Sequence, residues 1–412
     1  MSKKTTLLTV VTLVALLGWS TIPAPLHAAN NRRPLRVVLY PFIPEFASAA
    51  ETVKKSFEAE NPDIELTILD LSSNYYAPGD ATYVGQVDAD VIELDSVFLA
   101  DFVHHGKIQE LPADFLLPQS DLLSNAYRGS MLEGKRYGAA HWACRNFLFF
   151  KSADHPATPI EKLSQLEAYV DPNSSSKLLM DLRGKLTLGE LYLMAAFDRY
   201  RDWEHVAPAV QKLDAAVEND LIRLSKLCPS GDCRDQIFHE ITGIYGQQFA
   251  RKRSRALVGY SELLHSLLLE KLSCGDDCVG DKDIDVADLP LDDNGSVPIS
   301  WVDSFTVNTS CQGTCLSDAK KFVRMMNSDD MYLKVLLPSG FSFMKSPVAV
   351  GPVPAYLLPA KVSLYSNPRL LASAHLYSRL RQLVENAAVP TADRLNDQLR
   401  AIGKTIDSDL SK

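Results

Sequence analysis

The pattern of apolar and polar positions predicts alternating strands and helices near the start of the chain. Residues 35–40 (LRVVLY) form a run rich in β-branched side chains, and residues 45–60 carry apolar side chains at helical spacing. Pro62 ends that helix, and residues 64–71 and 90–95 predict two further strands. Alternation of this kind is typical of an α/β fold with a mostly parallel sheet and right-handed crossovers.

Helical patterns dominate the middle of the chain. They cover residues 186–200, 206–227 and 237–252, and a strand at 256–260 then leads into a helix at 261–272. We therefore expect a helix-rich region in addition to the first sheet.

Residues 274–298 interrupt this pattern and predict a loop. The stretch contains eight aspartates and five glycines or prolines, which favour turns over regular elements. No other segment has the composition of a long linker. We therefore expect two domains whose segments cross back and forth, and not two domains joined in series.

Composition limits the classes of function. The chain has 412 residues, of which 46% are apolar and 23% charged, so it is an ordinary globular chain with room for two or three domains. Its formal net charge is −9 and no Lys/Arg-rich run stands out, so we expect no nucleic acid and no anionic membrane as a partner. An acidic protein suits a small cationic ligand, although surplus carboxylates more often serve solubility.

Residues 1–29 have the layout of a secretory signal peptide. Lys3 and Lys4 precede an apolar stretch over residues 7–17, and Ala28 and Ala29 offer small side chains at a cleavage site. That stretch is short for a membrane span, and no later segment approaches roughly 18 uninterrupted apolar residues. The pattern predicts a secreted or periplasmic protein without stable membrane insertion.

Export changes how the seven cysteines are interpreted. Six of them form close pairs, which in an oxidising compartment predict short local disulfides, although other connectivities are open. The pairs are Cys228 with Cys233, Cys274 with Cys278, and Cys311 with Cys315. A zinc cluster is the alternative, but C-x4-C and C-x3-C spacings without nearby histidines fit it poorly. We predict no metal.

Cys144 is the cysteine left over, within a segment (residues 134–151) that predicts a turn and then an apolar strand. An unpaired thiol in an exported protein is exposed to oxidation unless it is buried or has a chemical role, so Cys144 is a candidate nucleophile. The alternative is an inert, buried thiol. A nucleophilic thiol needs a base, and His141 or the pair His104 and His105 could supply it.

Glu262 is a second candidate base. It follows the strand predicted at 256–260 and, with Ser261 as N-cap, lies in the first turn of the next helix, where the macrodipole favours a carboxylate. The alternative is an ordinary first-turn acid without a chemical role.

Aromatic and acidic residues lie beside several predicted strand ends, where α/β sheets bind ligands. Stacked aromatics with a few carboxylates suit a flat, cationic, nitrogen-rich ligand, although each aromatic taken alone is more often a core residue. The residues are Tyr40, Tyr260 and Trp301 with Asp95 and Asp303.

Three segments resemble extracytoplasmic solute-binding proteins of the two-lobed, maltose-binding-protein type. They are DVIELDSVFLADFVHHGKIQELP, GKRYGAAHWACRNFLFFK and DAKKFVRMMNSDD. The resemblance covers nearly the whole mature chain and implies a two-lobed, periplasmic-binding-protein-like (type II) α/β fold with a ligand cleft between the lobes. It implies one lobe from residues 33–140 and 304–346 and a second, helix-rich lobe from 141–303 and 347–412, with Cys144 in the cleft.

A narrower resemblance concerns Cys144 together with the GYSE sequence at residues 259–262. This combination resembles thiaminase I, the thiamine pyridinylases built on that fold. The resemblance implies that Cys144 is the catalytic nucleophile and Glu262 its base. It implies substrate-lining roles for Tyr40, Asp95, Tyr260, Trp301 and Asp303. Trp301 stands where the family leads us to expect a tyrosine, and the six paired cysteines look like an addition.

The function implied by this resemblance is cleavage of thiamine by transfer of its pyrimidine-methyl group to an amine or thiol acceptor. Thiamine and that acceptor are then the expected partners of a monomer that needs no cofactor. The alternative is an extracytoplasmic binding protein for thiamine or a related pyrimidine, without catalysis.

Overall fold

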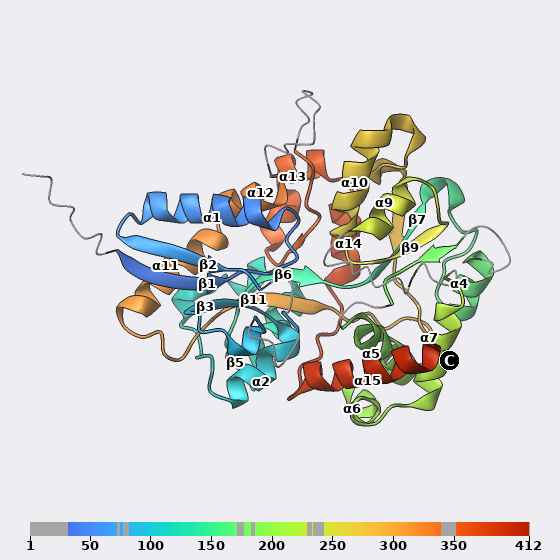
Figure 1. The fold of residues 1–412 in the computed structure, drawn as a ribbon, viewed down its shortest axis with the longest axis horizontal. Helices are drawn as coiled ribbons and strands as arrows, with labels where there is room; N and C mark the ends of the chain where they lie inside the picture. Colours follow the sequence, from blue (N-terminus) through green and yellow to red (C-terminus); the bar gives the residue numbers. More distant parts are fainter. Residues whose placement is uncertain are drawn as a thin grey trace, which may run out of the picture.

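The structure is a computed structural model, and two separate β-sheets organise it (Figure 1). It describes residues 32–71, 75–76, 82–170, 177–182, 186–228, 233, 243–338 and 352–411. The predicted signal peptide therefore lies outside the described residues. Each sheet carries its own helices, so the chain has the α/β, two-lobed architecture expected from the sequence.

The larger sheet has six strands in the order β12-β6-β11-β3-β1-β2. Its strands are β1 (Arg33–Val38), β2 (Ile64–Leu69), β3 (Val91–Asp95), β6 (Ala139–Cys144), β11 (Trp301–Val307) and β12 (Leu358–Pro359). β1 is parallel to β2 and β3, but β11 is antiparallel to both β3 and β6. The sheet is therefore mixed, and the expectation of a mostly parallel sheet is wrong because β11 is inserted in the opposite direction.

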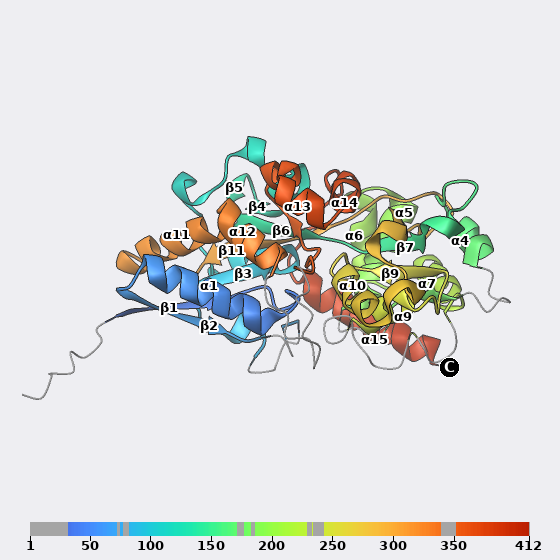
Figure 2. The same ribbon diagram turned by 90° about the horizontal axis from the view of Figure 1, so that it is seen from above.

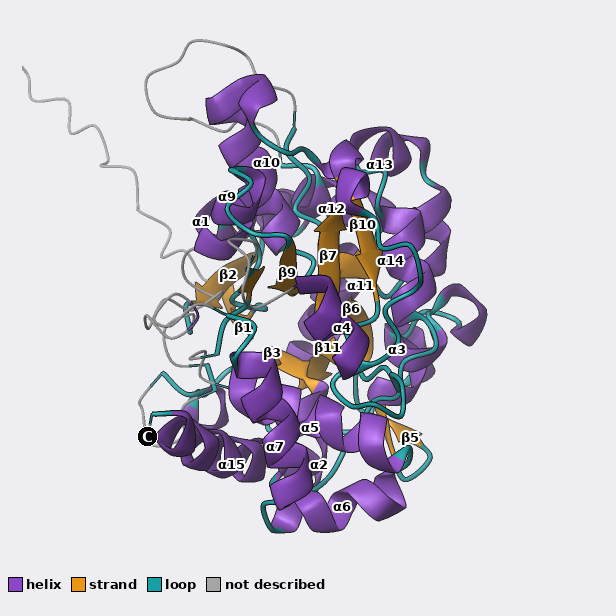
Figure 3. Ribbon diagram, turned by 90° about the vertical axis from the view of Figure 1, so that its right-hand side faces the viewer, coloured by secondary structure: helices purple, strands orange, loops and turns teal. Residues whose placement is uncertain are grey.

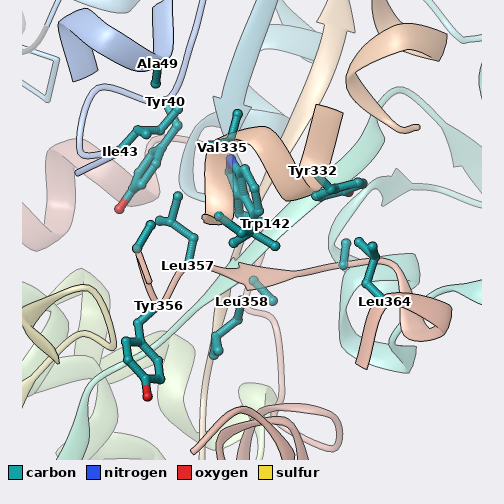
Figure 4. Close-up of a cluster of buried hydrophobic side chains, with 14 of the residues drawn as sticks. Tyr40, Ile43, Ala49, Trp142, Tyr332, Val335, Tyr356, Leu357, Leu358 and Leu364 are labelled. Atoms are coloured by element: carbon teal, nitrogen blue, oxygen red, sulfur yellow. The ribbon is translucent and has the colours of Figure 1, made fainter. Parts of the chain in front are cut away.

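Helices cover the larger sheet on the side where the early strands bury their apolar side chains. α1 (Phe46–Glu60) packs on β2, burying Ala49, Val53 and Phe57. α11 (Thr314–Met326) and α12 (Asp329–Leu336) lie beside α1 (Figure 2). Figure 4 shows the resulting core, in which Trp142 of β6 lies among Tyr332 and Val335 of α12 and Leu358 of β12. Short elements complete this lobe: α2 (Leu99–His104), α3 (Ser124–Gly129), β4 (Met131–Leu132), β5 (Lys135–Arg136) and α13 (Pro368–Ser373).

The smaller sheet has four strands in the order β10-β7-β9-β8. They are β7 (Phe147–Lys151), β8 (Leu178–Leu179), β9 (Ala256–Gly259) and β10 (Ile284–Ala287). β10 falls inside the stretch 274–298 that predicted only a loop. That expectation is wrong because Ile284 and Val286 bury alternate side chains while the strand pairs antiparallel with β7.

A helical layer accompanies the smaller sheet. It comprises α4 (Leu163–Val170), α5 (Thr187–Tyr200), α6 (Trp203–Gln211), α7 (Ala215–Ser225), α9 (Ile244–Ala250), α10 (Leu263–Cys274), α14 (Tyr377–Val384) and α15 (Leu395–Leu410). The C-terminal helix α15 packs against α5 (Figures 1 and 3). α5 buries side chains on every face, as expected for a helix enclosed by its neighbours.

Two predicted helix boundaries differ from the structure. The helix expected at 206–227 is two helices, because Lys212 is extended and the Asp214 carboxylate caps α7 by accepting from the backbone N–H groups of Ala216 and Val217. The helix expected from Ser261 begins at Leu263, and Glu262, not Ser261, is its N-cap residue. Part of the helix expected at 237–252 lies outside the described residues, and α9 is its described remainder.

The chain passes from one sheet to the other directly after Cys144. β6 ends there and β7 begins at Phe147, so Arg145 and Asn146 form the crossing. Arg145 is buried, donates to the Leu383 carbonyl oxygen at 2.7 Å and pairs with Asp288 at 2.8 Å. β11 returns the chain from β10 to the larger sheet, so both lobes use separate segments. The residue boundaries predicted for the lobes stay a prediction; β6 and β11 both run across them within the larger sheet.

The predicted disulfides are present. Cys228–Cys233, Cys274–Cys278 and Cys311–Cys315 are bonded, with Cα atoms 6.1, 5.8 and 5.2 Å apart, and Cys144 is free and buried. Within the described ranges no helix is long and apolar enough to cross a bilayer.

Candidate active site

The register of the larger sheet brings the predicted strand residues together at one edge. β3 ends at Asp95, β6 ends at Cys144 and β11 begins at Trp301. In the ladder Trp301 is opposite Cys144, and Asp303 is opposite Asp95. A register shift between Asp303 and Ser304 leaves His141 without a partner in the β6–β11 ladder, as in a β-bulge beside a functional site. We call Asp95, Cys144, Trp301 and Asp303 the strand wall.

Cys144 lies in an acidic, nearly dry environment. Its Sγ lies 3.7 Å from the Oδ2 atom of Asp303 and 3.8 Å from the Trp301 carbonyl oxygen, and 8% of the residue is exposed. Burial raises the pKa of the Cys144 thiol well above its ordinary value, and the charges of Asp303, Asp95 and Glu262 raise it further. The resting thiol is therefore protonated, and a base must take its proton during any reaction.

The two aspartates of the strand wall share this environment. Burial raises the pKa of Asp95 to about 6, although the Val97 N–H and the Tyr76 hydroxyl donate to its carboxylate. Burial and the charges of Asp95 and Glu93 raise the pKa of Asp303 well above its ordinary value. Two neighbouring carboxylates held this way strongly favour a cationic or N–H-donating ligand.

The opposite side of the site comes from the smaller lobe. Tyr260 and Glu262 lie in the turn between β9 and α10, and Thr187 and Glu190 lie in the first turn of α5. We call these four residues the helix wall. The Tyr260 hydroxyl donates a hydrogen bond to Glu190.

Tyr40 joins the two sides. It follows β1 in the larger lobe, and its hydroxyl donates to the Oε1 atom of Glu262 at 3.2 Å. Its own backbone N–H donates to the buried Glu93 carboxylate at 2.7 Å, which fixes its position. The hydroxyl of one lobe thus orients the candidate base of the other.

One cavity is lined by residues of both walls. Its lining residues are Tyr40, Phe42, Tyr76, Asp95, Cys144, Leu186, Thr187, Glu190 and Tyr260. Four of the predicted site residues therefore share one cavity: Tyr40, Asp95, Cys144 and Tyr260. Trp301 and Asp303 contact the thiol itself. Glu262 affects the thiol through its charge and is bonded to Tyr40, while the thiol itself is bonded to Asp303.

Five lining residues were not predicted from the sequence as site residues: Phe42, Tyr76, Leu186, Thr187 and Glu190. Glu190 lies within LTLGELYLMAAF, an apolar helical stretch in which one acid is the sole visible signal. An acid buried on a helix that is apolar on all other faces could have indicated a functional carboxylate.

The histidines considered as bases for Cys144 are engaged elsewhere. The His141 ring forms a buried hydrogen bond with Glu93 and packs among Phe305 and Tyr332. His104 pairs with Asp393 at 3.4 Å, and His105 lies on the surface near Asp101. Across the described residues, therefore, the Cys/His arrangement left open by the sequence is not assembled.

Metal-binding geometry does not coincide with this cavity. Within the described part of the chain, the groups of three side chains close enough to hold an ion are Asp101, His105 and Asp393, and Asp90 with the disulfide-bonded Cys311 and Cys315. Neither group includes a residue of the cavity.

Comparison with known proteins found similarity in sequence and in fold. The chain is 26% identical to Thiaminase-1 of Paenibacillus thiaminolyticus over 391 residues, which cover 90% of this chain and 87% of that protein. No family model matches. The fold is similar to that of Clostridium botulinum thiaminase I in complex with thiamin, with a TM-score of 0.76, 22% identity and coverage of 92% of this chain and 100% of that one.

The same fold extends to sugar-binding proteins. Maltose-bound MalE3 of T. maritima aligns with a TM-score of 0.61 and 15% identity, covering 92% of this chain and 94% of that chain. The fold is therefore the two-lobed, type II periplasmic-binding-protein fold, and the resemblance to thiaminase I inferred from short motifs is confirmed along nearly the whole chain.

Proposed function

We propose that the chain is a thiamine pyridinylase that transfers the pyrimidine-methyl group of thiamine to a nucleophilic acceptor. One observation carries the proposal: a free, buried Cys144 lies 3.7 Å from a carboxylate in a cavity of acids and aromatics, in a chain similar over 90% of its length to Thiaminase-1. Thiamine is flat, nitrogen-rich and cationic, which suits that cavity.

The first half of the reaction begins with deprotonation of Cys144. Glu262, held by the Tyr40 hydroxyl, takes the thiol proton, and the thiolate adds to the pyrimidine ring. Addition interrupts the aromaticity of that ring, so the bond from its methylene to the thiazolium nitrogen breaks and a neutral thiazole leaves. The pyrimidine remains bound to Cys144. Because burial opposes the thiolate, proton transfer and attack must be closely coupled.

The acids of the strand wall have a distinct part in this step. Asp95 and Asp303 lie beside Cys144, so they meet the pyrimidine that the thiol attacks. They accept hydrogen bonds from its amino group and offset positive charge on its ring nitrogens. In the second half an amine or thiol adds at the methylene, and Cys144 departs with its bonding electron pair.

Access to this cavity requires movement. All of its lining residues except Phe42 are buried, none of them more than 8% exposed. The lobes must therefore separate to admit thiamine and close again to exclude water, as expected for a site between two lobes.

Several finer statements remain predictions. They are a secreted or periplasmic location after removal of residues 1–29, a monomeric state, the absence of a cofactor, and the division of the lobes at the predicted boundaries.

A binding protein for thiamine would share this fold, so chemistry must separate the two functions. The test is intact-protein mass after incubation with thiamine and no added acceptor. We expect a pyrimidine-sized increment on the wild type and none on Cys144→Ser. If thiamine binds but the wild type neither gains mass nor consumes thiamine when an amine is added, the chain is the binding protein.

A further inference from the structure

We propose that Thr187 and Glu190, on the first turn of α5, form the acceptor subsite and select an amine over a thiolate. The inference rests on the proposed function and deepens it, because it assigns the chemical class of the second substrate. Neither residue has a part in the attack of Cys144 on thiamine described above.

Glu190 places a carboxylate of the smaller lobe in the cavity. The residue is 5% exposed, lines the cavity together with Cys144 and Asp95, and accepts from the Tyr260 hydroxyl. Its charge reaches the reaction centre, because it contributes to the raised pKa of Cys144 and is the largest charge effect raising the pKa of Tyr260. Its position in the first turn of a helix favours a negative charge.

Thr187 supplies a second polar group. Its hydroxyl is buried in a residue 5% exposed and has no hydrogen-bond partner among the described residues. It lies three positions before Glu190, so the two side chains share one face of α5, and both line the cavity. A buried hydroxyl without a partner is costly, and a ligand with a polar N–H group would satisfy it.

The position of the two walls distinguishes the acceptor from the pyrimidine. A ring bonded to Cys144 must lie within a bond length of Sγ and so beside Asp303, which is 3.7 Å from that sulfur. The thiazole is attached through the methylene, so it lies farther from Sγ than the ring that the sulfur attacks. The acceptor attacks the same methylene after the thiazole leaves, so it occupies the space bordered by Tyr260, Thr187 and Glu190.

The chemistry of the second step then favours an amine. The amine nitrogen forms a bond to the methylene carbon, the electron pair moves through the ring, and the carbon–sulfur bond breaks to return the Cys144 thiolate. The nitrogen becomes cationic as it bonds and passes its proton to the Glu190 carboxylate. A thiolate acceptor has no proton to give and is repelled by that carboxylate.

A matched pair of acceptors tests the proposal. Aniline and thiophenol have the same ring, but aniline is a neutral N–H donor at neutral pH and thiophenol is largely the anionic thiolate. We expect Glu190→Gln to lower the ratio of kcat/KM for aniline to kcat/KM for thiophenol by about tenfold or more, because it removes both the proton acceptor and the repulsion. We expect Thr187→Val to lower the same ratio by about threefold.

Two variants provide controls. Glu190→Asp keeps the charge and should keep the ratio within about threefold of the wild type. Glu204→Gln makes the same chemical change at an exposed acid on α6, outside the cavity, and should leave the ratio unchanged.

The outcomes separate this inference from the proposed function. Equal losses of kcat/KM with both acceptors in Glu190→Gln would show that Glu190 only supports Tyr260, and would overturn the acceptor subsite. A ratio of the two kcat/KM values that stays unchanged would overturn it as well. If Glu190→Gln does not fold, Glu190→Asp decides. A tenfold fall in the aniline-to-thiophenol ratio of kcat/KM in Glu190→Asp, which keeps the charge, would overturn the acceptor subsite. Absence of any covalent adduct in the wild type would instead defeat the proposed function.

Discussion

The two walls of the cavity are built in different ways. The strand wall places Asp95, Cys144 and Asp303 on three adjacent strands whose ladder fixes their spacing. The helix wall places Tyr260 and Glu262 in a turn and Glu190 at the start of a helix. In the proposed mechanism, the groups that hold the pyrimidine lie on the sheet of one lobe, and the groups that accept protons lie on a turn and a helix of the other lobe.

Burial of the nucleophile also limits its reactivity in this structure. Cys144 is protonated while buried among acids, so its thiol reacts slowly with oxidants. Its candidate base, Glu262, comes from the smaller lobe and bonds to the hydroxyl of Tyr40 from the larger lobe. The proposed proton transfer from Cys144 to Glu262 therefore requires the two lobes to be together.

The largest expected effect comes from replacing the candidate nucleophile of the strand wall. Cys144→Ser should lower thiamine cleavage at least about 10³-fold, because a serine hydroxyl is a much weaker nucleophile in an acidic cavity. Binding of thiamine, measured by calorimetry, should persist within about tenfold, since the aromatic and acidic side chains remain. Undiminished cleavage in Cys144→Ser would remove this cysteine from the mechanism.

The next prediction concerns which wall supplies the base that deprotonates Cys144. Glu262→Gln should slow adduct formation by about 10²- to 10⁴-fold, because the amide cannot accept the thiol proton. Asp303 is the rival, since its carboxylate is the one hydrogen-bonded to Sγ. We expect Asp303→Asn to raise KM for thiamine more than it lowers kcat. The reverse pattern, with single-turnover adduct formation slowed more by Asp303→Asn than by Glu262→Gln, would assign the base to the strand wall.

Both walls were predictable from the sequence only in part. Asp95 ends a strand that local periodicity indicates, and such ends meet at one edge of a sheet. β6, which ends at Cys144, lies where the pattern predicted a turn, so that expectation is wrong. Tyr260 and Glu262 were indicated by their place after the strand predicted at 256–260, and the roles given to them came from the resemblance of the GYSE motif. Periodicity could not place Glu190, because α5 is buried on every face and no single stripe marks its functional side.

The errors in the fold have the same physical origin. β10 was missed because aspartates around Ile284 and Val286 favour turns locally, while pairing with β7 overrides that preference. The antiparallel insertion of β11 depends on long-range pairing that no local pattern encodes. The break before α7 was visible in principle, since Asp214 is an ordinary N-cap residue.

A smaller effect concerns pH and the acids of the strand wall. Because the pKa of Asp95 is raised from 3.8 to about 6, its carboxyl becomes anionic as pH rises through that value, and KM for the cationic substrate should fall between about pH 5 and 7. Asp95→Asn should remove this inflection. A profile that keeps it in Asp95→Asn would assign it to another group.

The raised pKa of Asp95 also makes folding stability depend on pH. The unfolded carboxyl ionises near its ordinary value, and the folded one keeps its proton until about pH 6, so folding stability declines as pH rises from about 4 to 6. Urea unfolding of the wild type and Asp95→Asn across this range checks the sign. A free energy of unfolding that rises between about pH 4 and 6 in the wild type but not in Asp95→Asn would contradict this prediction.

The smallest expected effect concerns a disulfide outside both walls. The Cys311–Cys315 disulfide follows β11, and neither cysteine lines the cavity. Replacing both by alanine should lower the free energy of unfolding by about 2 kcal/mol or less, because the bond closes a very short loop. kcat/KM should stay within about twofold of the wild type. Thermal unfolding and steady-state kinetics measure the two quantities. A large loss of activity in a folded variant would show that the far end of β11 controls the strand wall, and that its geometry is not fixed by the ladder alone.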